Sequence, residues 1–274
     1  MKKYAVIGNP IAHSLSPIIH QLFAEQVGID LEYSAIALEE AHFEVQLLSL
    51  LHDELQGVNI TSPFKKRCLG VVDVVLKNAQ SAQSVNTIWK ENNQLIADST
   101  DGVGFHLDLQ RLNIALENKK VLILGAGGAV SAILSVLFKN HVAQVDILNR
   151  TLEKSHELVR HFLYLGLMHA VPFSTPLKTE YDVILNSVPV CLLSQYVNIT
   201  HCVDFFHQDT VCYDLCYSLT ETLFQQWVKN HNIVNHFNGL GMLIYQAAES
   251  FRLWHHQSVN VIPVFQYFDK KRIN

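Results

Sequence analysis

Short apolar runs alternate with amphipathic segments along nearly the whole chain. Residues 3–7 and 31–37 have the length of buried strands, and between them Ser16 and Pro17 open a helix that stops at Gly28. The alternation continues with a helix, a strand and another helix at residues 39–51, 55–60 and 65–81. Strands that alternate with helices predict an α/β fold built mainly from parallel sheets.

The pattern indicates two domains. Residues 85–89 and 94–97 flank a polar turn at residues 91–93 and predict a hairpin. After Asp101 and Gly102 an amphipathic helix runs to about Asn113, and residues 120–124 then start a second α/β unit. The predicted domains are residues 1–101, completed by 239–274, and residues 102–238.

The last long helix carries a clear apolar face. Residues 240–256 space five apolar side chains along one side of a helix, namely Leu240, Ile244, Ala247, Phe251 and Trp254. A helix of this length can cross back onto the first domain. We therefore expect the C-terminal helices to pack against that domain.

Composition supports a compact protein that acts on small molecules. The 274 residues are 49% apolar and 16% charged, which is enough for a large core and two domains. The net charge of -5 comes without any basic run, so neither nucleic acid nor an anionic membrane is an expected partner. We expect a monomer or a homodimer that binds a small-molecule substrate.

Targeting, disulfide and metal signals are missing from the sequence. The first eight residues are too short for a signal peptide and no run of about 18 apolar residues occurs, so we expect a cytoplasmic protein. The five cysteines are odd in number and lack CxxC spacing, which favours reduced, mostly buried thiols. The fifteen histidines show no ligand spacing, and no metal site is predicted.

The most informative stretch is Gly-Val-Asn-Ile-Thr-Ser-Pro-Phe-Lys at residues 57–65. If residues 55–60 form a strand, Asn59 and Thr61 lie on one face at its carboxyl end. Pro63 can then open a helix that brings Lys65 over the same place. The segment therefore predicts a small polar site with one amine, although alone it equally fits a structural corner with a solvated lysine.

A glycine-rich turn marks the second unit as a nucleotide-binding unit. The apolar residues 121–124 lead into Gly-Ala-Gly-Gly-Ala and then into an apolar helix through Phe138. This strand, turn and helix allow a pyrophosphate to approach the backbone at a helix N-terminus. A tight structural turn is the alternative. The residues assigned to the cofactor here are Gly125, Ala126, Gly127, Gly128 and Ala129.

The end of the next strand indicates which cofactor is bound. Residues 142–148 are followed by Asn149, Arg150 and Thr151, with Lys154 one turn into the next helix. An NAD site would place an acidic residue at this strand end, whereas an amide, a hydroxyl and two cations suit a 2′-phosphate. The sequence therefore favours NADP. Asp146 lies three residues before the strand end and is interpreted as structural.

Ordered motifs from the first strand to the penultimate helix resemble those of the shikimate dehydrogenases. They begin with Gly-Asn-Pro-Ile-Ala-His-Ser-Leu-Ser-Pro at residues 8–17 and the 57–65 segment. They continue with Val-Asn-Thr at 85–87, Thr-Asp-Gly at 100–102, the glycine turn and Asn-Arg-Thr at 149–151. Tyr213, Asp214 and Tyr217, then Gly-Leu-Gly-Met at 239–242 and Gln246, complete the set.

The resemblance implies a fold and a reaction. It implies an N-terminal α/β substrate domain joined to an NADP-binding Rossmann domain, with reversible NADPH-dependent reduction of 3-dehydroshikimate to shikimate in the chorismate pathway. It also implies roles for named residues. Ser14, Ser16 and Tyr217 would bind the substrate carboxylate, and the ring hydroxyls would be held by Asn59, Thr61, Asn86 and Gln246. Leu215 and Gly239 would contact the cofactor.

Lys65 and Asp101 would form the catalytic pair. The lysine ammonium would stabilise the negative charge that develops on the ketone oxygen, and Asp101 would orient it and bind the reacting hydroxyl. Which of the two transfers the proton is left open. From local sequence alone, Ser16 and Asp101 could also act only as helix caps.

Two departures from the family pattern concern the cofactor side. Val130 and Ser131 occupy positions where the family usually has a small residue and an arginine, and the segment at residues 187–191 lacks the usual small residues. Two alternatives are open, and these departures support only the second. The chain could be a quinate/shikimate dehydrogenase that accepts quinate or NAD, or a non-catalytic relative that binds NADP or shikimate without turnover.

Overall fold

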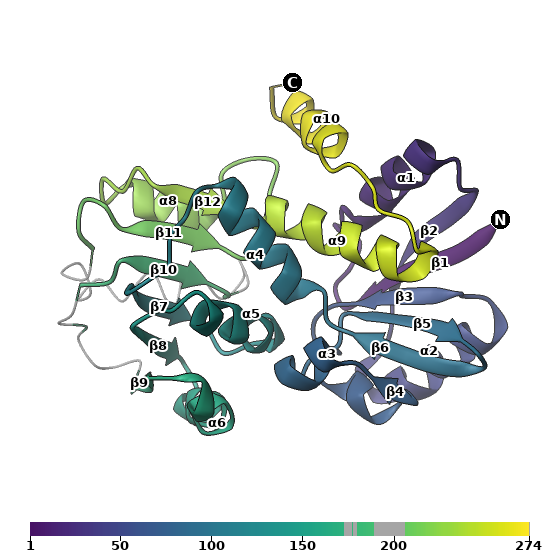
Figure 1. Ribbon diagram of the computed structural model, residues 1–274, viewed down its shortest axis with the longest axis horizontal. Helices are drawn as coiled ribbons and strands as arrows, with labels where there is room; N and C mark the ends of the chain where they lie inside the picture. Colours follow the sequence, from purple (N-terminus) through teal and green to yellow (C-terminus); the bar gives the residue numbers. More distant parts are fainter. Residues whose placement is uncertain (173–176, 178–179, 189–205, 274) are drawn as a thin grey trace. The chain divides into compact units, whose positions relative to one another are not determined.

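The chain folds into two compact units, shown as a ribbon in Figure 1. The computed structural model describes residues 1–172, 177, 180–188 and 206–273. The first unit contains Met1–Leu107 and Met242–Asn274, and the second contains Asp108–Gly241. The chain leaves the first unit within α4 (Asp101–Arg111) and returns to it within α9 (Leu240–His255).

The first unit is built on a mixed six-stranded sheet. Its strands are β1 (Lys2–Gly8), β2 (Leu31–Ala37), β3 (Gly57–Ile60), β4 (Val74–Val75), β5 (Thr87–Glu91) and β6 (Gln94–Asp98). Their order is β2-β1-β3-β5-β6-β4. The β1 strand pairs in parallel with β2 and β3, and β4 pairs in parallel with β6, whereas β5 is antiparallel to β3 and β6.

The predicted hairpin is confirmed. Its turn consists of Asn92 and Asn93, which have φ angles of 51° and 63°. Two consecutive residues with positive φ form the turn type that matches the twist of paired strands, and asparagine tolerates that conformation. The strand after Val85 starts two residues later than expected, at Thr87, so Asn86 precedes the strand.

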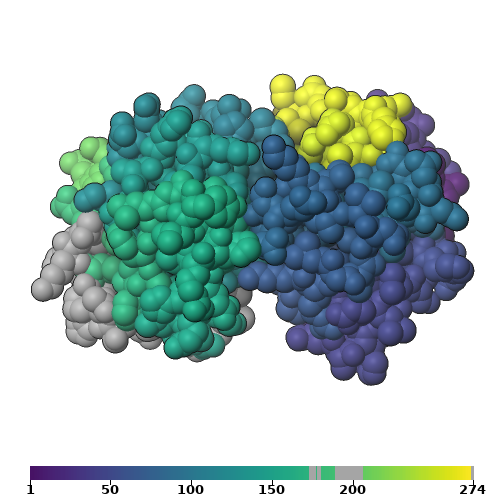
Figure 2. Space-filling model, turned by 60° about the horizontal axis from the view of Figure 1, so that its bottom comes forward, coloured from purple at the N-terminus to yellow at the C-terminus, as the bar shows by residue number. Residues whose placement is uncertain are grey.

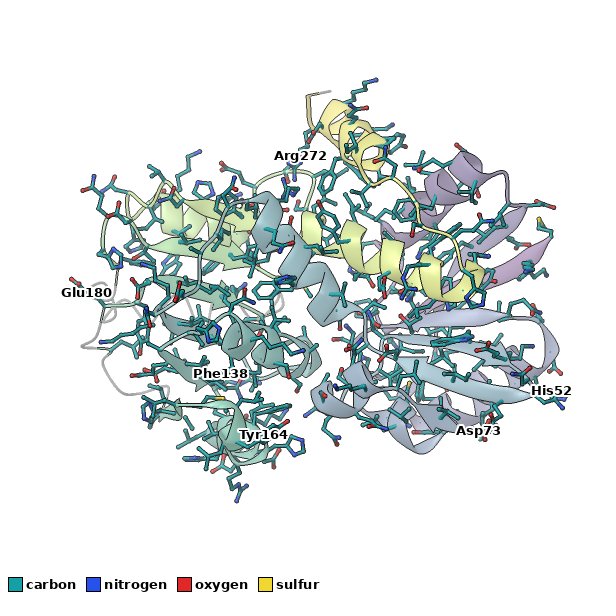
Figure 3. The ribbon with its side chains drawn as sticks, in the orientation of Figure 1. His52, Asp73, Phe138, Tyr164, Glu180 and Arg272 are labelled. Atoms are coloured by element: carbon teal, nitrogen blue, oxygen red, sulfur yellow. The ribbon has the colours of Figure 1, made fainter. Side chains whose placement is uncertain are left out.

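The helix predicted at residues 65–81 is wrong. This stretch contains a 3-10 helix at Arg67–Gly70, the short strand β4 and the helix α3 (Lys77–Ala82). The β-branched valines of this stretch favour a strand over a helix, and β4 pairs with β6. Asp73, labelled in Figure 3, supports that pairing because its carboxylate accepts the Leu95 N–H at 2.7 Å.

The helices of the first unit include those from the C-terminus. They are α1 (Ser16–Val27), α2 (Phe43–Asp53), α3, α9 and α10 (Ile262–Ile273). All five side chains of the predicted apolar face of α9 are buried, with exposures of 8% or less. In Figure 2 the yellow α10 lies on the surface of this unit beside the purple N-terminal segment, as expected for C-terminal helices that pack back on the first domain.

The second unit is a Rossmann-type parallel sheet with helices. Its strands are β7 (Lys120–Leu124), β8 (Gln144–Asn149), β9 (Met168–Pro172), β10 (Val183–Asn186), β11 (Val211–Asp214) and β12 (His236–Asn238). They follow the order β12-β11-β10-β7-β8-β9, and every pair is parallel. The described helices are α5 (Gly128–Lys139), α6 (Leu152–Phe162) and α8 (Leu223–Lys229). The predicted α/β fold class is confirmed.

The structure describes some of the cysteines that were expected to be reduced and buried, and it also allows a search for membrane-spanning helices. Cys68 and Cys212 are free and buried, and burial raises the pKa of both, that of Cys68 to about 12. Cys191 and Cys202 lie outside the described residues. Across the described parts of the chain, no helix combines the length and apolarity needed to cross a bilayer.

An aromatic cluster joins α9 to α1 and to the edge of the first sheet. The His20 ring is fully buried and stacks on Tyr33 with ring centres 4.3 Å apart, and the Trp254 ring lies 5.2 Å away. His255 contacts Tyr4 and Phe251 in the same cluster. Burial lowers the pKa of His20 to about 3 and that of His255 to about 4, so both rings are neutral at pH 7.

This cluster predicts acid sensitivity of the fold. Below pH 6.5 an unfolded histidine binds a proton, whereas folded His20 binds none until the pH approaches 3. The free energy of unfolding should therefore be highest above pH 6.5 and fall below it, by up to about 1.4 kcal/mol per pH unit for each such histidine. Urea denaturation at several pH values measures this. In His20→Phe the free energy of unfolding should decrease less steeply below pH 6.5. Replacing the exposed His156 with Gln should leave the decrease as in the wild type. Equal pH dependence in the wild type and both variants would contradict the prediction.

Candidate active site

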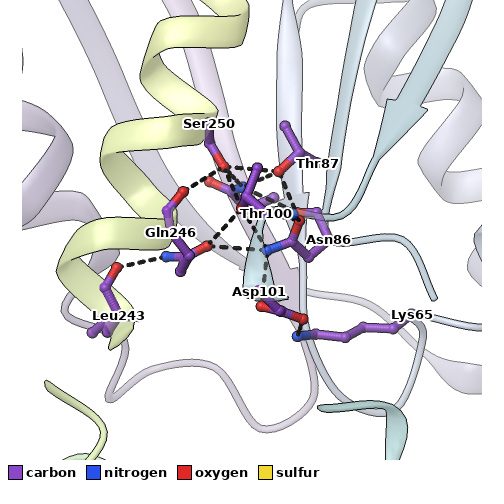
Figure 4. A network of polar contacts seen from close by, with 9 residues as sticks. Lys65, Asn86, Thr87, Thr100, Asp101, Leu243, Gln246 and Ser250 are labelled. Atoms are coloured by element: carbon purple, nitrogen blue, oxygen red, sulfur yellow. Dashed lines mark hydrogen bonds and ion pairs between the residues drawn. The ribbon is translucent and has the colours of Figure 1, made fainter. Parts of the chain in front are cut away.

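In the first unit, polar side chains from distant segments meet at the ends of the central strands (Figure 4). Asn59 lies on β3 and Lys65 in the loop that follows it, while Asn86 precedes β5 and Asp101 begins α4. The fifth contributor is α9, which supplies Gln246 and Ser250. The structure thus brings five predicted site residues into one place, and they are Asn59, Lys65, Asn86, Asp101 and Gln246.

Lys65 and Asp101 form a close ion pair. Lys65 Nζ lies 2.5 Å from Asp101 Oδ2, and the two side chains are only 13% and 6% exposed. Asp101 lies in the first turn of α4, where the helix dipole favours a negative charge. The alternative that Asp101 only caps a helix is corrected, because Asp101 is itself the first residue of α4 and its carboxylate accepts the Asn86 side-chain amide.

Asn86 determines how this pair is held. Asn86 Oδ1 accepts the backbone N–H of Thr100 at 2.8 Å, and because a backbone N–H can only donate, the amide orientation is fixed. Asn86 Nδ2 therefore points the other way, towards Asp101 Oδ1 at 2.9 Å and Gln246 Oε1 at 3.1 Å. At 2% exposure, the Asn86 amide is engaged almost entirely inside the protein.

Gln246 keeps one donor for a ligand. Its Oε1 accepts from Asn86, and its Nε2 donates to the backbone carbonyl of Leu243 at 2.8 Å. An amide nitrogen carries two hydrogens, so one remains after this bond. Lys65 similarly has two further ammonium hydrogens beyond the one directed at Asp101. The site can therefore donate several hydrogen bonds to a ligand oxygen.

Asn59 is committed to the protein itself. Its Oδ1 accepts from the Tyr33 hydroxyl at 2.7 Å, and its Nδ2 faces Thr87 and Ser250 at 3.2 Å and 3.0 Å and the Asn86 carbonyl at 3.0 Å. The side chain is 6% exposed. The two hydrogens of Nδ2 thus have three acceptors within the protein, so the Asn59 amide has no hydrogen left for a ligand.

The predicted carboxylate-binding serines lie at the start of α1. The structure corrects the idea that Ser16 caps this helix, because Ser16 is its first residue and Leu15 is the N-cap. Instead, Ser14 Oγ accepts the Ser16 N–H at 3.3 Å. Ser16 is 4% exposed, whereas Ser14 is half-buried, as is Thr61 at the end of β3. Ser14 therefore has more surface to offer a ligand than Ser16.

The remaining predicted substrate residue belongs to the second unit. Tyr217 lies in the loop after β11, together with Leu215. In that loop the Leu215 N–H donates to the Asn186 carbonyl at 2.8 Å, and the Gly239 N–H donates to the Cys216 carbonyl at 3.0 Å. Leu215 and Gly239 are therefore held together at one end of the β10, β11 and β12 strands.

A buried carboxylate supports this loop. Asp214 Oδ1 accepts the Asn186 side-chain amide at 2.8 Å and the Cys216 N–H at 3.0 Å. Burial raises the pKa of Asp214, which its hydrogen bonds partly offset. Asp214 is part of the sequence motifs, but the sequence did not indicate that it binds Asn186.

The glycine turn has the geometry of a nucleotide-binding loop. Gly125 has a φ of +101°, a conformation that residues with side chains rarely adopt. Gly127 is the N-cap of α5, and a Cβ added to it would meet nothing within 4 Å. The first N–H groups of a helix have no partner within the helix, so a helix N-terminus with open space at its N-cap fits the pyrophosphate of a dinucleotide.

The strand whose end was expected to carry the cofactor-selecting residues is β8. β8 ends at Asn149, whose side chain donates to the Thr151 carbonyl at 2.8 Å, and Thr151 is the N-cap of α6. Arg150 lies between them, and Lys154 is exposed in the first turn of α6. Two cations, an amide and a hydroxyl therefore follow β8, with no carboxylate at the strand end.

The departures from the family pattern lie mostly in buried positions. Val130 and Ser131 are buried in α5, at 0% and 1% exposure, and Val188 is also buried. Residues 189–191 lie outside the described part of the chain. Asp146 is structural as interpreted, since it accepts the Tyr181 hydroxyl at 2.6 Å and contacts His169. Among the described residues no group of His, Cys, Asp and Glu could hold a metal ion.

The sequence interpretation missed the hydroxyls around Asn86. Thr87, Thr100 and Ser250 are each at most 1% exposed and contact Asn86, Gln246 or each other. Thr87 is adjacent to Asn86, and Ser250 follows Gln246 by one helical turn. That spacing could have indicated Ser250, because residues i and i+4 lie on one helix face.

Family models match three segments of the chain. Residues 6–88 match the shikimate dehydrogenase substrate binding domain, and residues 107–190 match shikimate / quinate 5-dehydrogenase. Residues 239–261 match the shikimate 5'-dehydrogenase C-terminal domain. A relative described as shikimate dehydrogenase (NADP(+)) from Legionella pneumophila (strain Lens) is 39% identical, covering 96% of this chain and 95% of its own. One from Cellvibrio japonicus (strain Ueda107) is 36% identical, covering 95% and 94%.

A solved structure of the same family has a similar fold. Shikimate 5-dehydrogenase from Thermus thermophilus in complex with NADP(H) and shikimate has a TM-score of 0.83 at 28% identity, covering 98% of this chain and 99% of its own. The fold and these matches define an oxidoreductase class that joins a substrate domain to a Rossmann unit. Within that class, this chain belongs to the shikimate dehydrogenase family.

The open space at Gly127 predicts a selective effect on the cofactor. Gly127→Ala should leave the melting temperature nearly unchanged, since no atom lies within 4 Å of the new methyl group. It should weaken NADPH binding by about tenfold or more, because the methyl group blocks close approach of the pyrophosphate. Calorimetric titration with NADPH measures this. Gly70→Ala, which also meets nothing within 4 Å, is the control, and unchanged NADPH affinity in Gly127→Ala would refute the assignment.

Proposed function

We propose that this protein catalyses the reversible NADPH-dependent reduction of 3-dehydroshikimate to shikimate. The observation that carries the proposal is the buried ion pair of Lys65 and Asp101, 2.5 Å apart, in a chain of this family. The proposal places the reaction in aromatic amino-acid biosynthesis. It assigns substrate binding and catalysis to residues 1–101 and 239–274, and NADP binding to residues 102–238.

The chemistry of a ketone reduction explains the pair. NADPH supplies the hydride, and negative charge then develops on the substrate oxygen. The Lys65 ammonium can donate a hydrogen bond to that oxygen, since only one of its hydrogens is directed at Asp101. In the oxidative direction the substrate is an alcohol, and the free lone pairs of Asp101 can accept its hydroxyl hydrogen. The pair therefore suits both directions.

The remaining polar groups suit a hydroxylated carboxylic acid. Gln246 offers an amide hydrogen, and Thr61 offers a half-buried hydroxyl at the end of β3. Ser14 and Ser16 offer hydroxyls beside the N-terminus of α1, where the helix dipole favours an anion. We assign the substrate carboxylate to these two serines and Tyr217. Asn59 and Asn86 we assign to orienting their neighbours, because both amides are engaged inside the protein.

The proposed cofactor is NADP. Gly125 to Ala129 would hold the pyrophosphate, and Asn149, Arg150, Thr151 and Lys154 would hold the ribose phosphate. The absence of a carboxylate at the end of β8 supports this choice over NAD, since an acidic residue there would repel a 2′-phosphate. We further propose a cytoplasmic location and a monomer or homodimer.

Replacing the lysine tests the catalytic assignment. Lys65→Ala should lower kcat by roughly a hundredfold or more, because the charge that stabilises the developing alkoxide is lost. The dissociation constant for shikimate should change much less, since the other polar groups remain. The measurement is NADPH formation from shikimate and NADP+, with shikimate binding followed by calorimetry.

The neighbouring lysine provides a matched control. Lys66 is exposed, so Lys66→Ala should retain wild-type kcat. An unchanged kcat in Lys65→Ala would refute its role. The same assay with quinate and with NAD+ distinguishes the proposed enzyme from a broader quinate/shikimate dehydrogenase. Binding of shikimate by the wild type without any NADPH formation would instead identify a non-catalytic relative.

A further inference from the structure

Four buried residues around the active site form a closed ring of hydrogen bonds (Figure 4). Asn86 Nδ2 lies 2.9 Å from Thr100 Oγ1, which lies 3.1 Å from Ser250 Oγ. Ser250 Oγ lies 2.8 Å from Thr87 Oγ1, and Thr87 Oγ1 lies 2.9 Å from Asn86 Oδ1. The ring starts and ends on the same amide, and its members are at most 2% exposed.

The direction of the ring is determined by the Asn86 amide. Its oxygen cannot donate and its nitrogen cannot accept, so the hydrogen bond at one end of the ring leaves Nδ2 and the bond at the other end arrives at Oδ1. A single hydrogen on each hydroxyl satisfies this order, with Thr100 donating to Ser250 and Ser250 to Thr87. Ser250 Oγ also lies 3.1 Å from the Gln246 carbonyl and Thr100 Oγ1 lies 3.2 Å from Asn86 Oδ1, so each of these hydrogens has a second acceptor close by. Bonds that run in one direction around a buried ring polarise each other and strengthen cooperatively.

The ring uses one of the two hydrogens on Asn86 Nδ2 and leaves the other for the active site. One Nδ2 hydrogen goes to Thr100, and the other faces Asp101 Oδ1 at 2.9 Å and Gln246 Oε1 at 3.1 Å. If the amide turned over, its oxygen would face the Asp101 carboxylate and repel it. The same flip would also bring the Asn86 oxygen against Gln246 Oε1, where two acceptors repel each other, while Gln246 Nε2 stays bound to the Leu243 carbonyl.

We infer that Thr87 and Ser250 are positioning residues for catalysis, because their hydroxyls close the ring that holds the Asn86 amide in the orientation set by the Thr100 N–H. Neither residue is exposed, so neither contacts a ligand directly. Through Asn86 they set which atoms of Asp101 and Gln246 face the substrate. This inference rests on the proposed function and extends it to residues that carry no role in the motifs described above.

The test removes the hydroxyl without changing the shape of the side chain. Thr87→Val opens the ring and should lower kcat/KM for shikimate by about tenfold, the effect of one buried hydrogen bond that aligns a reacting group. Thr87→Ser keeps the hydroxyl and should stay within about threefold of the wild type. The KM for NADP+ should be unchanged in both variants.

A second variant and a control separate positioning from stability. Ser250→Ala opens the same ring, so it should match Thr87→Val, and the double variant should be no worse than the more impaired single variant. Ser84→Ala removes another fully buried hydroxyl, one without a hydrogen-bond partner among the described residues, and should leave kcat/KM unchanged. Circular dichroism establishes that each variant is folded.

The outcomes distinguish this inference from the proposed function. Wild-type turnover of shikimate together with near-wild-type kcat/KM in Thr87→Val and Ser250→Ala would overturn the inference alone. Fully additive effects in the double variant would also overturn it. If the wild type binds shikimate without turnover, the dissociation constants for shikimate of Thr87→Val and Ser250→Ala are compared with that of the wild type in place of kcat/KM. A wild type that neither binds nor oxidises shikimate would overturn the proposed function and this inference with it.

Discussion

The active site depends on keeping the ion pair of Lys65 and Asp101 largely out of water. Removing two charges from water costs several kcal/mol per ion, and mutual attraction offsets this only when further hydrogen bonds satisfy the remaining atoms. Asp101 receives such help from the Asn86 amide and from its place in the first turn of α4. The surrounding polar network is therefore a condition for burying the pair.

The need for a polar network around the buried ion pair explains why distant parts of the chain meet in the first unit. A network with this many donors and acceptors needs groups from β3, the start of β5, the start of α4 and α9. The antiparallel turn between β5 and β6 brings Asn86 and Thr100 together, because the two strands end side by side. The return of the chain through α9 then adds Gln246 and Ser250. An α/β unit without this last helix would leave the Asn86 amide without part of its support.

The sequence predicted the features that follow from periodicity and failed where tertiary pairing decided. The apolar face of α9, the hairpin turn at Asn92 and the parallel second unit all followed from local patterns. The stretch at residues 65–81 did not, because its valines pair with β6 and a partner strand cannot be read from one segment. Lys65, Asp101 and Gln246 were identified through family motifs, whereas Ser250 was missed because its role depends on residues more than a hundred positions away.

The polarity of the site follows from which hydrogen-bonding groups the protein uses internally. The side-chain amides of Asn59 and Asn86 bind neighbouring protein groups, so these two residues orient their neighbours. Lys65 and Gln246 retain hydrogens, and Asp101 retains lone pairs. A ligand oxygen beside Lys65 therefore meets donors when it carries negative charge and meets the Asp101 acceptor when it carries a hydrogen. This combination favours interconversion of a ketone and an alcohol, because one fixed set of side chains can bind both forms of the oxygen.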